Sequence, residues 1–373
     1  MDSSTERSPE YIPTLDGWRA IAILWVMLLH SKEELFPDGG NLFFRAMRPI
    51  ALSGTAGVDI FFGLSGFLIS SKMIAERSRS GKFDIGRFYI KRCFRILPPY
   101  LCYLLVIGLL WFGGIFRIDW RTYLSCFVFL RNYLPDTLLA EWYTGHLWSL
   151  SVEEHFYLIW PWLFAAGATL QRTRRVVLML GLVMIIWRYV DLTVHPLHFL
   201  RFYINESGRR SDHCLGGLFL GCWLALLFAE PGMRCQMARL LSPTIFAALG
   251  VAFLGGAVFL TPVQARLESA LFVPFLLSGT VLHPQWFVSR LLELPPVRWV
   301  GRLSYSLYIW QQLFLVDDSK SKLFPSLQRF PVSWIGAFVV ASASFGLIEK
   351  PAIALGQRIL ARRSPGLASP PEY

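Results

Sequence analysis

The chain has 373 residues, of which 54% are hydrophobic and only 16% charged, and its formal net charge is +11. Soluble domains carry roughly 25% charged residues, so a soluble fold this apolar would lack the polar side chains needed to cover its surface. The composition excludes a cytosolic globular enzyme, a disordered chain and a secreted disulfide scaffold. It indicates a protein whose solvent is largely lipid.

Ten stretches are predicted to span a membrane as helices, since about 20 mainly apolar residues cross the roughly 30 Å hydrocarbon core of a bilayer. We place them near residues 15–31, 52–72, 96–116, 147–170, 176–195, 212–229, 240–265, 269–289, 301–316 and 330–348. The stretches 240–265 and 269–289 are separated by a short turn expected at Thr261, Pro262 and residues 266–268. The predicted fold class is an all-α membrane protein, a polytopic bundle of about ten transmembrane helices.

The sequence contains no visible internal repeat and no soluble module. We expect one transmembrane domain over residues 14–356, between a disordered N-terminal tail (1–13) and a cytoplasmic tail (357–373). The leader has one arginine against two acidic residues and no small-residue cleavage site. We therefore expect the first span to be retained rather than cleaved as a signal peptide.

Lysine and arginine set the orientation, because cytoplasmic loops carry an excess of them. With ten spans both termini share one side, and that side collects 22 of the 36 Lys and Arg residues, eight of them in residues 72–95. We expect both termini in the cytoplasm, in a multi-pass protein of the cell (inner) membrane surrounded by membrane lipids.

The positive charge does not indicate nucleic acid as a partner, because the basic residues lie between apolar runs and form no nucleic-acid-binding motif. The six cysteines include no C-x-x-C pair and mostly lie in apolar stretches. We interpret them as small apolar side chains rather than a metal or redox site.

Arg19 and His30 are the first ionisable residues of note in the predicted spans. They are eleven residues apart, so at 100° per residue they differ by about 20° and share a helix face, about 16 Å apart along the axis. The pair alone is equally consistent with an arginine that extends to one membrane interface and a histidine at the other.

Three further predicted helices carry ionisable residues that we expect at about the depth of His30. They are Asp59, Glu153, Glu154, Arg210 and Asp212. A carboxylate beside a histidine fixes its tautomer and raises its basicity, which a general base requires. Each residue alone is also consistent with an interfacial side chain or a structural ion pair, but four helices converging at one depth favour a site.

A second charged group lies at the expected cytoplasmic end and includes Arg87, Lys91, Arg92 and Arg95. Arg92 and Arg95 share a helix face if the helix has begun there, and guanidinium groups bind phosphates bidentately. Positive-inside topology with anionic headgroups is the alternative, although it leaves two arginines directly before a Pro-Pro-Tyr sequence unexplained. Phosphate binding at one end and base chemistry at the other suit a donor such as acyl-coenzyme A.

In these residues the chain resembles the integral-membrane acyltransferase 3 family, over roughly residues 12–355. The resemblance rests on the order and spacing of Leu15–Leu24, His30, Gly57–Ser70, Arg92-x-x-Arg95, Leu147–Tyr157, Arg210–Asp212, Gly301–Trp310 and Glu349–Pro351. Members of this family O-acylate sugars of lipopolysaccharides, peptidoglycan, exopolysaccharides, Nod-factor-type oligosaccharides and some antibiotics.

The resemblance implies that Arg19 and His30 are essential and that His30 is the base. It associates Arg92 and Arg95 with the acyl donor, and it matches Glu153 to the glutamate of the family's Ser-Val-Glu segment.

The chain also departs from the family pattern. Many members carry a histidine where this chain has Gln311 followed by Gln312. Because glutamine does not titrate, we expect no acid–base role there. Many members also carry a soluble esterase-like C-terminal domain, and we expect none in this chain.

We therefore expect a membrane O-acyltransferase that moves an acyl group from cytoplasmic acyl-CoA to a hydroxyl of a glycan, lipid-linked sugar or related acceptor. We expect the acyl group to be acetyl and the reaction to need no metal. The expected catalytic residues are His30, Asp59 and Glu153, the expected donor-binding residues are Arg19, Arg92 and Arg95, and the expected acceptor-binding residues are Glu154, Arg210 and Asp212.

The alternative is a transporter or flippase of lipid-linked or acylated sugars, since midplane ionisable residues also suit transport. No pair of broken helices in matching positions supports it. The sequence leaves open the acceptor, the acyl chain length, the oligomeric state, a homo-oligomer included, and whether His30 is a base or a transient acyl carrier.

Overall fold

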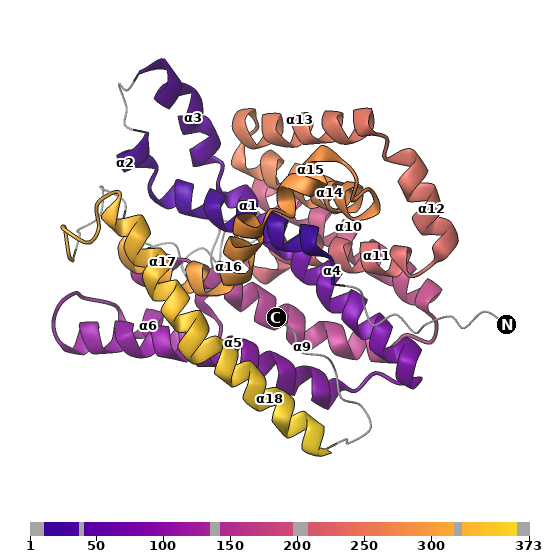
Figure 1. Ribbon diagram of the computed structural model, residues 1–373, viewed down its shortest axis with the longest axis horizontal. Coiled ribbons are helices and arrows are strands. Elements are labelled where there is room, and N and C mark those ends of the chain that lie inside the picture. Colours follow the sequence, from indigo (N-terminus) through magenta and orange to yellow (C-terminus); the bar gives the residue numbers. More distant parts are fainter. Residues whose placement is uncertain (1–10, 37–40, 135–141, 197–207, 317–322, 364–373) are drawn as a thin grey trace.

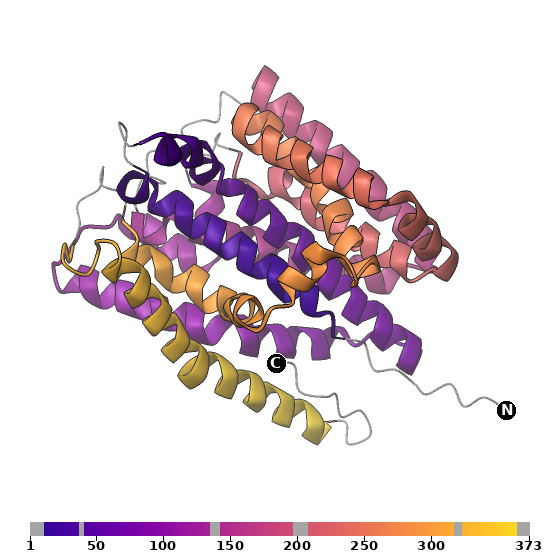
Figure 2. The same cartoon turned by 45° about the horizontal axis from the view of Figure 1, so that its top comes forward.

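The computed structural model describes residues 11–36, 41–134, 142–196, 208–316 and 323–363, and in these ranges the chain is helical without a strand (Figure 1). The helices are α1 (Pro13–His30), α2 (Lys32–Leu35), α3 (Leu42–Leu52), α4 (Thr55–Ser80), α5 (Ile85–Phe112), α6 (Trp120–Phe127), η1 (Arg131–Tyr133), α8 (Trp142–Gly145), α9 (Leu147–Ala166), α10 (Leu170–Val194), α11 (Ser211–Phe228), α12 (Pro231–Leu240), α13 (Pro243–Phe259), α14 (Pro262–Leu282), α15 (Phe287–Leu292), α16 (Pro295–Phe314), α17 (Val332–Ser344), the π-helical turn η3 (Phe345–Glu349) and α18 (Lys350–Arg363). The long helices lie side by side, as Figure 2 illustrates. Residues 1–10 and 364–373, which include most of the predicted tails, lie outside the described residues.

Each of the ten predicted spans coincides with a helix of the structure, which confirms the all-helical fold class. Among the residues that the structure describes, six helices are long and apolar enough to cross a membrane: α4, α5, α10, α11, α14 and the continuous α17–α18. A seventh span results if α12 and α13, which meet at a bend of 76°, count as one. The prediction of about ten crossings, and that of cytoplasmic termini, therefore still rest on the sequence.

Helix α1 runs through the middle of the bundle and packs on α4 and α16 (Figure 1). Glycines allow the close approach on both sides. A Cβ atom at Gly57 of α4 would lie 2.4 Å from the backbone oxygen of Ala22, and one at Gly301 of α16 would lie 1.8 Å from that of Asp16. Small residues at helix interfaces are the usual means of close packing in lipid, where no hydrophobic force drives helices together.

Helix α4 packs equally closely on α11 on its other side. Gly66 faces the backbone of Leu218, and Gly221 faces that of Gly63, at distances that leave no room for a methyl group. Phe62 lies beside Gly217 and Phe67 beside Phe228, so residue numbers rise together along the contact and α4 and α11 run in the same direction. This packing fixes the side chains that α4 directs towards its neighbours.

Two predicted boundaries need correction. Helix α5 begins at Ile85, eleven residues before the predicted span, because the Asp84 side chain caps it by accepting a hydrogen bond from the Arg87 amide at 2.9 Å. Helix α14 begins at Pro262, because Thr261 and Gln264 form a capping box. Residues 266–268, predicted as part of a turn, are therefore helical.

Helix α18 continues to Arg363, so residues 357–363, which the sequence analysis assigns to a cytoplasmic tail, are helical. All six cysteines are free thiols.

We expect Gly301→Ala to destabilise the protein, because the new methyl group would force α1 and α16 apart; overpacking of this kind costs about 1–3 kcal/mol. The melting temperature in detergent measures the effect. Gly250→Ala in α13 is the matched control, since nothing lies within 4 Å of the added Cβ. Equal melting temperatures for the two variants would contradict the close α1–α16 contact.

Candidate active site

A cavity with about 690 Å³ of space between its atoms, open solvent at its mouth included, lies among α1, α4, α5, α9 and α16. Its polar lining comes from all five helices and consists of Arg19, Ser65, Arg92, Arg95, Ser149, Glu153, Tyr157, Ser304, Tyr305 and Tyr308. Of these helices, α1, α9 and α16 do not reach the apolarity expected of a membrane span. Arg19 of α1, Glu153 of α9 and hydroxyl side chains of α9 and α16 face the cavity rather than lipid, which contributes to the difference.

Three arginines meet in this cavity. Arg92 and Arg95 lie one helical turn apart on α5, as predicted, and Arg19 comes from α1. In the described part of the chain no carboxylate lies within 4 Å of Arg92 or Arg95, and Arg92 stacks over the Tyr157 ring at 4.9 Å. The two guanidinium groups therefore retain hydrogen-bond donors for an anionic ligand.

Arg19 forms an ion pair with Asp16, whose Oδ1 lies 3.5 Å from the arginine Nη1. The Tyr11 hydroxyl donates to the same carboxylate. Burial of Tyr11 and this hydrogen bond raise the pKa of its hydroxyl, so Tyr11 stays a neutral donor. Asp16 thereby orients Arg19 from outside the cavity.

Glu153 lies in the same cavity as the arginines. Its carboxylate accepts hydrogen bonds from the Ser65 hydroxyl at 2.9 Å and from the Tyr157 hydroxyl at 3.0 Å. The sequence analysis expects Glu153 at the depth of His30; the structure instead brings it together with Arg19, Arg92 and Arg95.

A second hollow of about 440 Å³ adjoins the cavity at one end. Arg92 and Arg95 line both spaces, and Lys72 and Lys91 add two further cations to the second. A charged ligand could therefore contact four basic side chains before it reaches Arg19.

His30 lies at the far end of α1 and does not line the cavity. Its Nδ1 is 3.3 Å from Oε1 of Gln311, and its ring meets Trp142 edge to face with centroids 5.4 Å apart. The next glutamine, Gln312, accepts a hydrogen bond from the backbone amide of His146 at 3.2 Å. The two glutamines at which the sequence departs from the family pattern therefore lie in the surroundings of His30.

Tyr308 separates the cavity from His146. Its hydroxyl is 2.5 Å from the Ser149 hydroxyl and donates to the His146 carbonyl at 2.8 Å. The path from the arginines to His30 along α1 thus passes a wall of hydrogen-bonded polar side chains.

The structure does not bring Asp59 to His30. Helix α4 runs antiparallel to α1, with Gly54 facing Trp25 and Gly57 facing Ala22. This register places Asp59 level with about Ala20, on the order of 15 Å from His30 along the axis. The expectation of equal depth is wrong, because it assumed that α4 enters the bundle level with the end of α1. Asp59 lines a different pocket.

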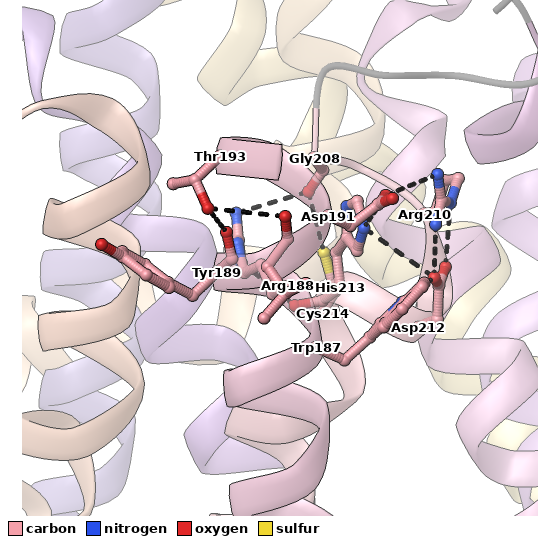
Figure 3. Close-up of polar contacts among 11 residues, drawn as sticks. Trp187, Arg188, Tyr189, Asp191, Thr193, Gly208, Arg210, Asp212, His213 and Cys214 are labelled. Carbon is pink, nitrogen blue, oxygen red and sulfur yellow. Dashed lines mark hydrogen bonds and ion pairs between the residues drawn. The ribbon is translucent and has the colours of Figure 1, made fainter. Parts of the chain in front are cut away.

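Arg210 and Asp212 form part of an ion-pair cluster between α10 and α11 (Figure 3). The Arg210 guanidinium is 2.9 Å from Asp191 and 2.5 Å from Asp212. Asp191 also lies 2.8 Å from Nε2 of His213. Because Arg210 is buried and engaged on both sides, its geometry suits a clamp between two helices. Glu154 is half-buried on α9 beside Glu153 but lines none of the pockets described here.

Several lining residues escaped sequence reasoning, among them Ser65, Tyr157, Tyr305 and Tyr308. The available signal was hydroxyl side chains that recur three or four residues apart in otherwise apolar helices. Glu349 also escaped it: this buried carboxylate accepts a hydrogen bond from Ser306 at 2.8 Å and sits on the π-helical turn η3. In the described residues no three His, Cys, Asp or Glu side chains gather as a metal site requires.

Residues 12–348 match the acyltransferase domain family. Similar curated proteins include the peptidoglycan O-acetyltransferase OatA of Listeria monocytogenes, 27% identical over 94% of this chain and 57% of the relative. The putative peptidoglycan O-acetyltransferase YrhL of Bacillus subtilis is 28% identical (95% and 56%), and the O-acetyltransferase OatA of Staphylococcus aureus 26% (83% and 51%). The chain thus spans about half the length of the curated relatives it matches. No solved structure matches it.

We expect Arg210→Met to destabilise the protein by about 3–5 kcal/mol, because it leaves the buried Asp191 carboxylate without its arginine. The free energy of unfolding or the melting temperature in detergent measures this. Arg172→Met, at an exposed position near the start of α10, the helix that carries Asp191, removes the same charge and should change little. A fully stable Arg210→Met protein would contradict the clamp.

Proposed function

The chain belongs to the acyltransferase domain family, and we propose that it transfers an acetyl group from acetyl-CoA to a hydroxyl of a glycan of the peptidoglycan type. The observation that carries the donor assignment is the set of three arginines in one cavity, two of them without a carboxylate partner in the described residues. The relatives' names favour acetyl transfer over the transporter alternative.

In this proposal the phosphates of the donor bind at the second hollow, against Lys72, Lys91, Arg92 and Arg95. Guanidinium groups bind phosphate oxygens with paired hydrogen bonds. With ten membrane crossings and both termini in the cytoplasm, as the sequence predicts, this hollow lies on the cytoplasmic side, where acyl-CoA is made. The pantetheine arm then extends through the cavity past Arg19 towards His30.

His30 is the proposed base. An amide oxygen only accepts hydrogen bonds, so the contact with Gln311 Oε1 favours the tautomer with a proton on Nδ1 and the lone pair on Nε2. The orienting role expected for Asp59 or Glu153 therefore passes to Gln311. Deprotonation of the acceptor hydroxyl by Nε2 prepares its attack on the thioester carbonyl, and coenzyme A leaves as the thiol. The arm must first displace the Tyr308 hydrogen bonds that close the cavity.

Glu153 balances the charge of the arginine cluster in this proposal. Its two hydrogen bonds hold it in the cavity wall without an ion pair to Arg92 or Arg95, which leaves both guanidinium groups to the donor. Glu154, Arg210 and Asp212 stay predictions as acceptor-binding residues.

The donor site is tested by Arg92→Gln combined with Arg95→Gln. Charge-assisted hydrogen bonds contribute about 1.5–3 kcal/mol each, so we expect acetyl-CoA affinity to fall by at least about tenfold. Equilibrium binding of radiolabelled acetyl-CoA to the protein in nanodiscs measures it. Lys82→Gln, an exposed loss of the same charge just before α5, is the control. Unchanged affinity in the double variant would reduce these arginines to topology determinants.

The catalytic assignment is tested by His30→Ala, which we expect to lower acetyl transfer by about 10²–10⁴-fold while donor binding persists. Gln311→Leu should slow transfer less, because it removes the orienting oxygen but not the base. Transfer of label from acetyl-CoA to glycan in a hydroxylamine-sensitive form measures both. A His30→Ala protein with full activity would remove His30 from the mechanism.

A further inference from the structure

A separate pocket lies among α4, α10, α11 and α14; it has about 320 Å³ of space between its atoms, open solvent at its mouth included, and room for about one water-sized group. Four ionisable side chains line it, one from each helix: Asp59, Arg188, His213 and Arg266. Apart from Asp59 as a proposed partner of His30, none of them has a role in the reaction derived above.

Each of these side chains directs an unpartnered polar atom into a buried space. In the part of the chain that the structure describes, Asp59 Oδ2, Arg188 Nε, His213 Nδ1 and Arg266 Nη1 have no hydrogen-bond partner. Asp59 is 8% exposed, Arg188 5% and His213 2%. A buried polar group without a partner costs about 1–3 kcal/mol, so four at one pocket indicate a ligand rather than an accident of packing.

The opposite charges in this pocket do not form a direct ion pair. Within the described ranges, no nitrogen of Arg188 or Arg266 comes within 4 Å of an Asp59 oxygen. The carboxylate and the guanidinium groups instead face the space between them.

Contacts in and beside the ion-pair cluster of α10 and α11 fix two of the side chains that line the pocket, Arg188 and His213 (Figure 3). Arg188 uses Nη1 and Nη2 to donate to the backbone carbonyls of His213 and Gly208, at 3.1 and 3.3 Å. His213 is fixed through Nε2 by Asp191. Arg188 Nη1 and Nη2 and His213 Nε2 are thus engaged in contacts within the protein, and Arg188 Nε and His213 Nδ1 remain for a ligand.

Hydroxyl groups fit this arrangement better than ions do. An anion would face the Asp59 carboxylate, and a cation would face two guanidinium groups. A hydroxyl has one donor and two acceptor positions, so it can donate to Asp59 Oδ2 while it accepts from Arg188 Nε and Arg266 Nη1. We propose that this pocket binds one hydroxyl group of a sugar in the acceptor glycan while the sugar ring stays at its mouth, an assignment that rests on the proposed function.

Aromatic side chains connect the pocket to the donor cavity. Phe62 lines both spaces, and it packs edge to face on Trp148 with centroids 6.2 Å apart. Arg266 and Arg209 lie over the Trp148 ring at 5.3 and 5.8 Å. A few convergent polar groups beside an apolar aromatic wall are typical of small-molecule sites.

The sugar held in this pocket is not the one that is acetylated. Asp59 is level with the middle of α1, about 15 Å from His30 by the helix register. A glycan several sugars long spans that separation, so one sugar is held at Asp59 while another presents its hydroxyl to His30.

The test uses the full-length protein in nanodiscs and the N-acetylglucosamine tetramer chitotetraose as probe. Its binding is followed by saturation-transfer nuclear magnetic resonance, and acetyl-CoA binding is measured separately. We expect Asp59→Asn and Arg266→Gln each to weaken tetramer binding at least about tenfold, as loss of a charge-assisted hydrogen bond predicts, with acetyl-CoA affinity unchanged. Arg266 is only half-buried, so its variant tests the site even if Asp59→Asn does not fold.

Glu268→Gln, on the same helix as Arg266, and Arg290→Gln, at an exposed position of α15, are the matched controls and should bind the tetramer normally. Wild-type affinity in both pocket variants, or a wild-type protein that binds acetyl-CoA but no tetramer, overturns this inference alone. A different outcome separates the two proposals. If the wild-type protein binds the tetramer but no acetyl-CoA, and the pocket variants lose tetramer binding, the proposed donor is wrong and the pocket assignment stands.

Discussion

An ionisable side chain inside a lipid-embedded bundle is costly unless it is paired or faces a polar cavity. This constraint sorts the charged residues of the chain into two kinds. Arg210, Asp191 and Asp212 satisfy it by pairing with one another between α10 and α11. Arg92, Arg95 and Glu153 satisfy it by lining a cavity. The first kind holds helices together, and the second lines the site of the proposed chemistry.

The same constraint explains which helices are least apolar. Helices α1, α9 and α16 surround the cavity and carry its arginine, carboxylate and hydroxyl groups, and they can do so because α4, α5 and other apolar helices enclose them. Close packing at Gly57 and Gly301 holds α1 between α4 and α16. Arg19 of α1 is therefore held in a fixed position in the cavity wall.

Donor and acceptor sites are separated in the proposed scheme by aromatic rather than charged groups. Phe62 lines both pockets, and Tyr308 closes the cavity on the side of His30. An apolar partition excludes water from the thioester until the acceptor is in place, and exclusion of water limits hydrolysis of reactive groups. The arrangement thus fits transfer to a sugar hydroxyl better than transfer to water.

The sequence by itself determined the features that depend on local composition and helical period. The ten apolar stretches coincide with helices, and Arg92 and Arg95 share a face because three residues make nearly one turn. Arg19 and His30 lie at two ends of one helix for the same reason. Capping at Asp84 and Thr261 is also local, so the sequence contains the signals that mark where α5 and α14 begin.

Only the tertiary structure decided which residues meet across helices. The register of α1 against α4 is set by glycine contacts at Gly54 and Gly57, and it moved Asp59 away from His30. The partner of His30 is Gln311, 281 residues later in the chain. Helical period predicts the face on which a residue lies but carries no information about the sliding of one helix along another, because that depends on contacts between residues far apart in sequence.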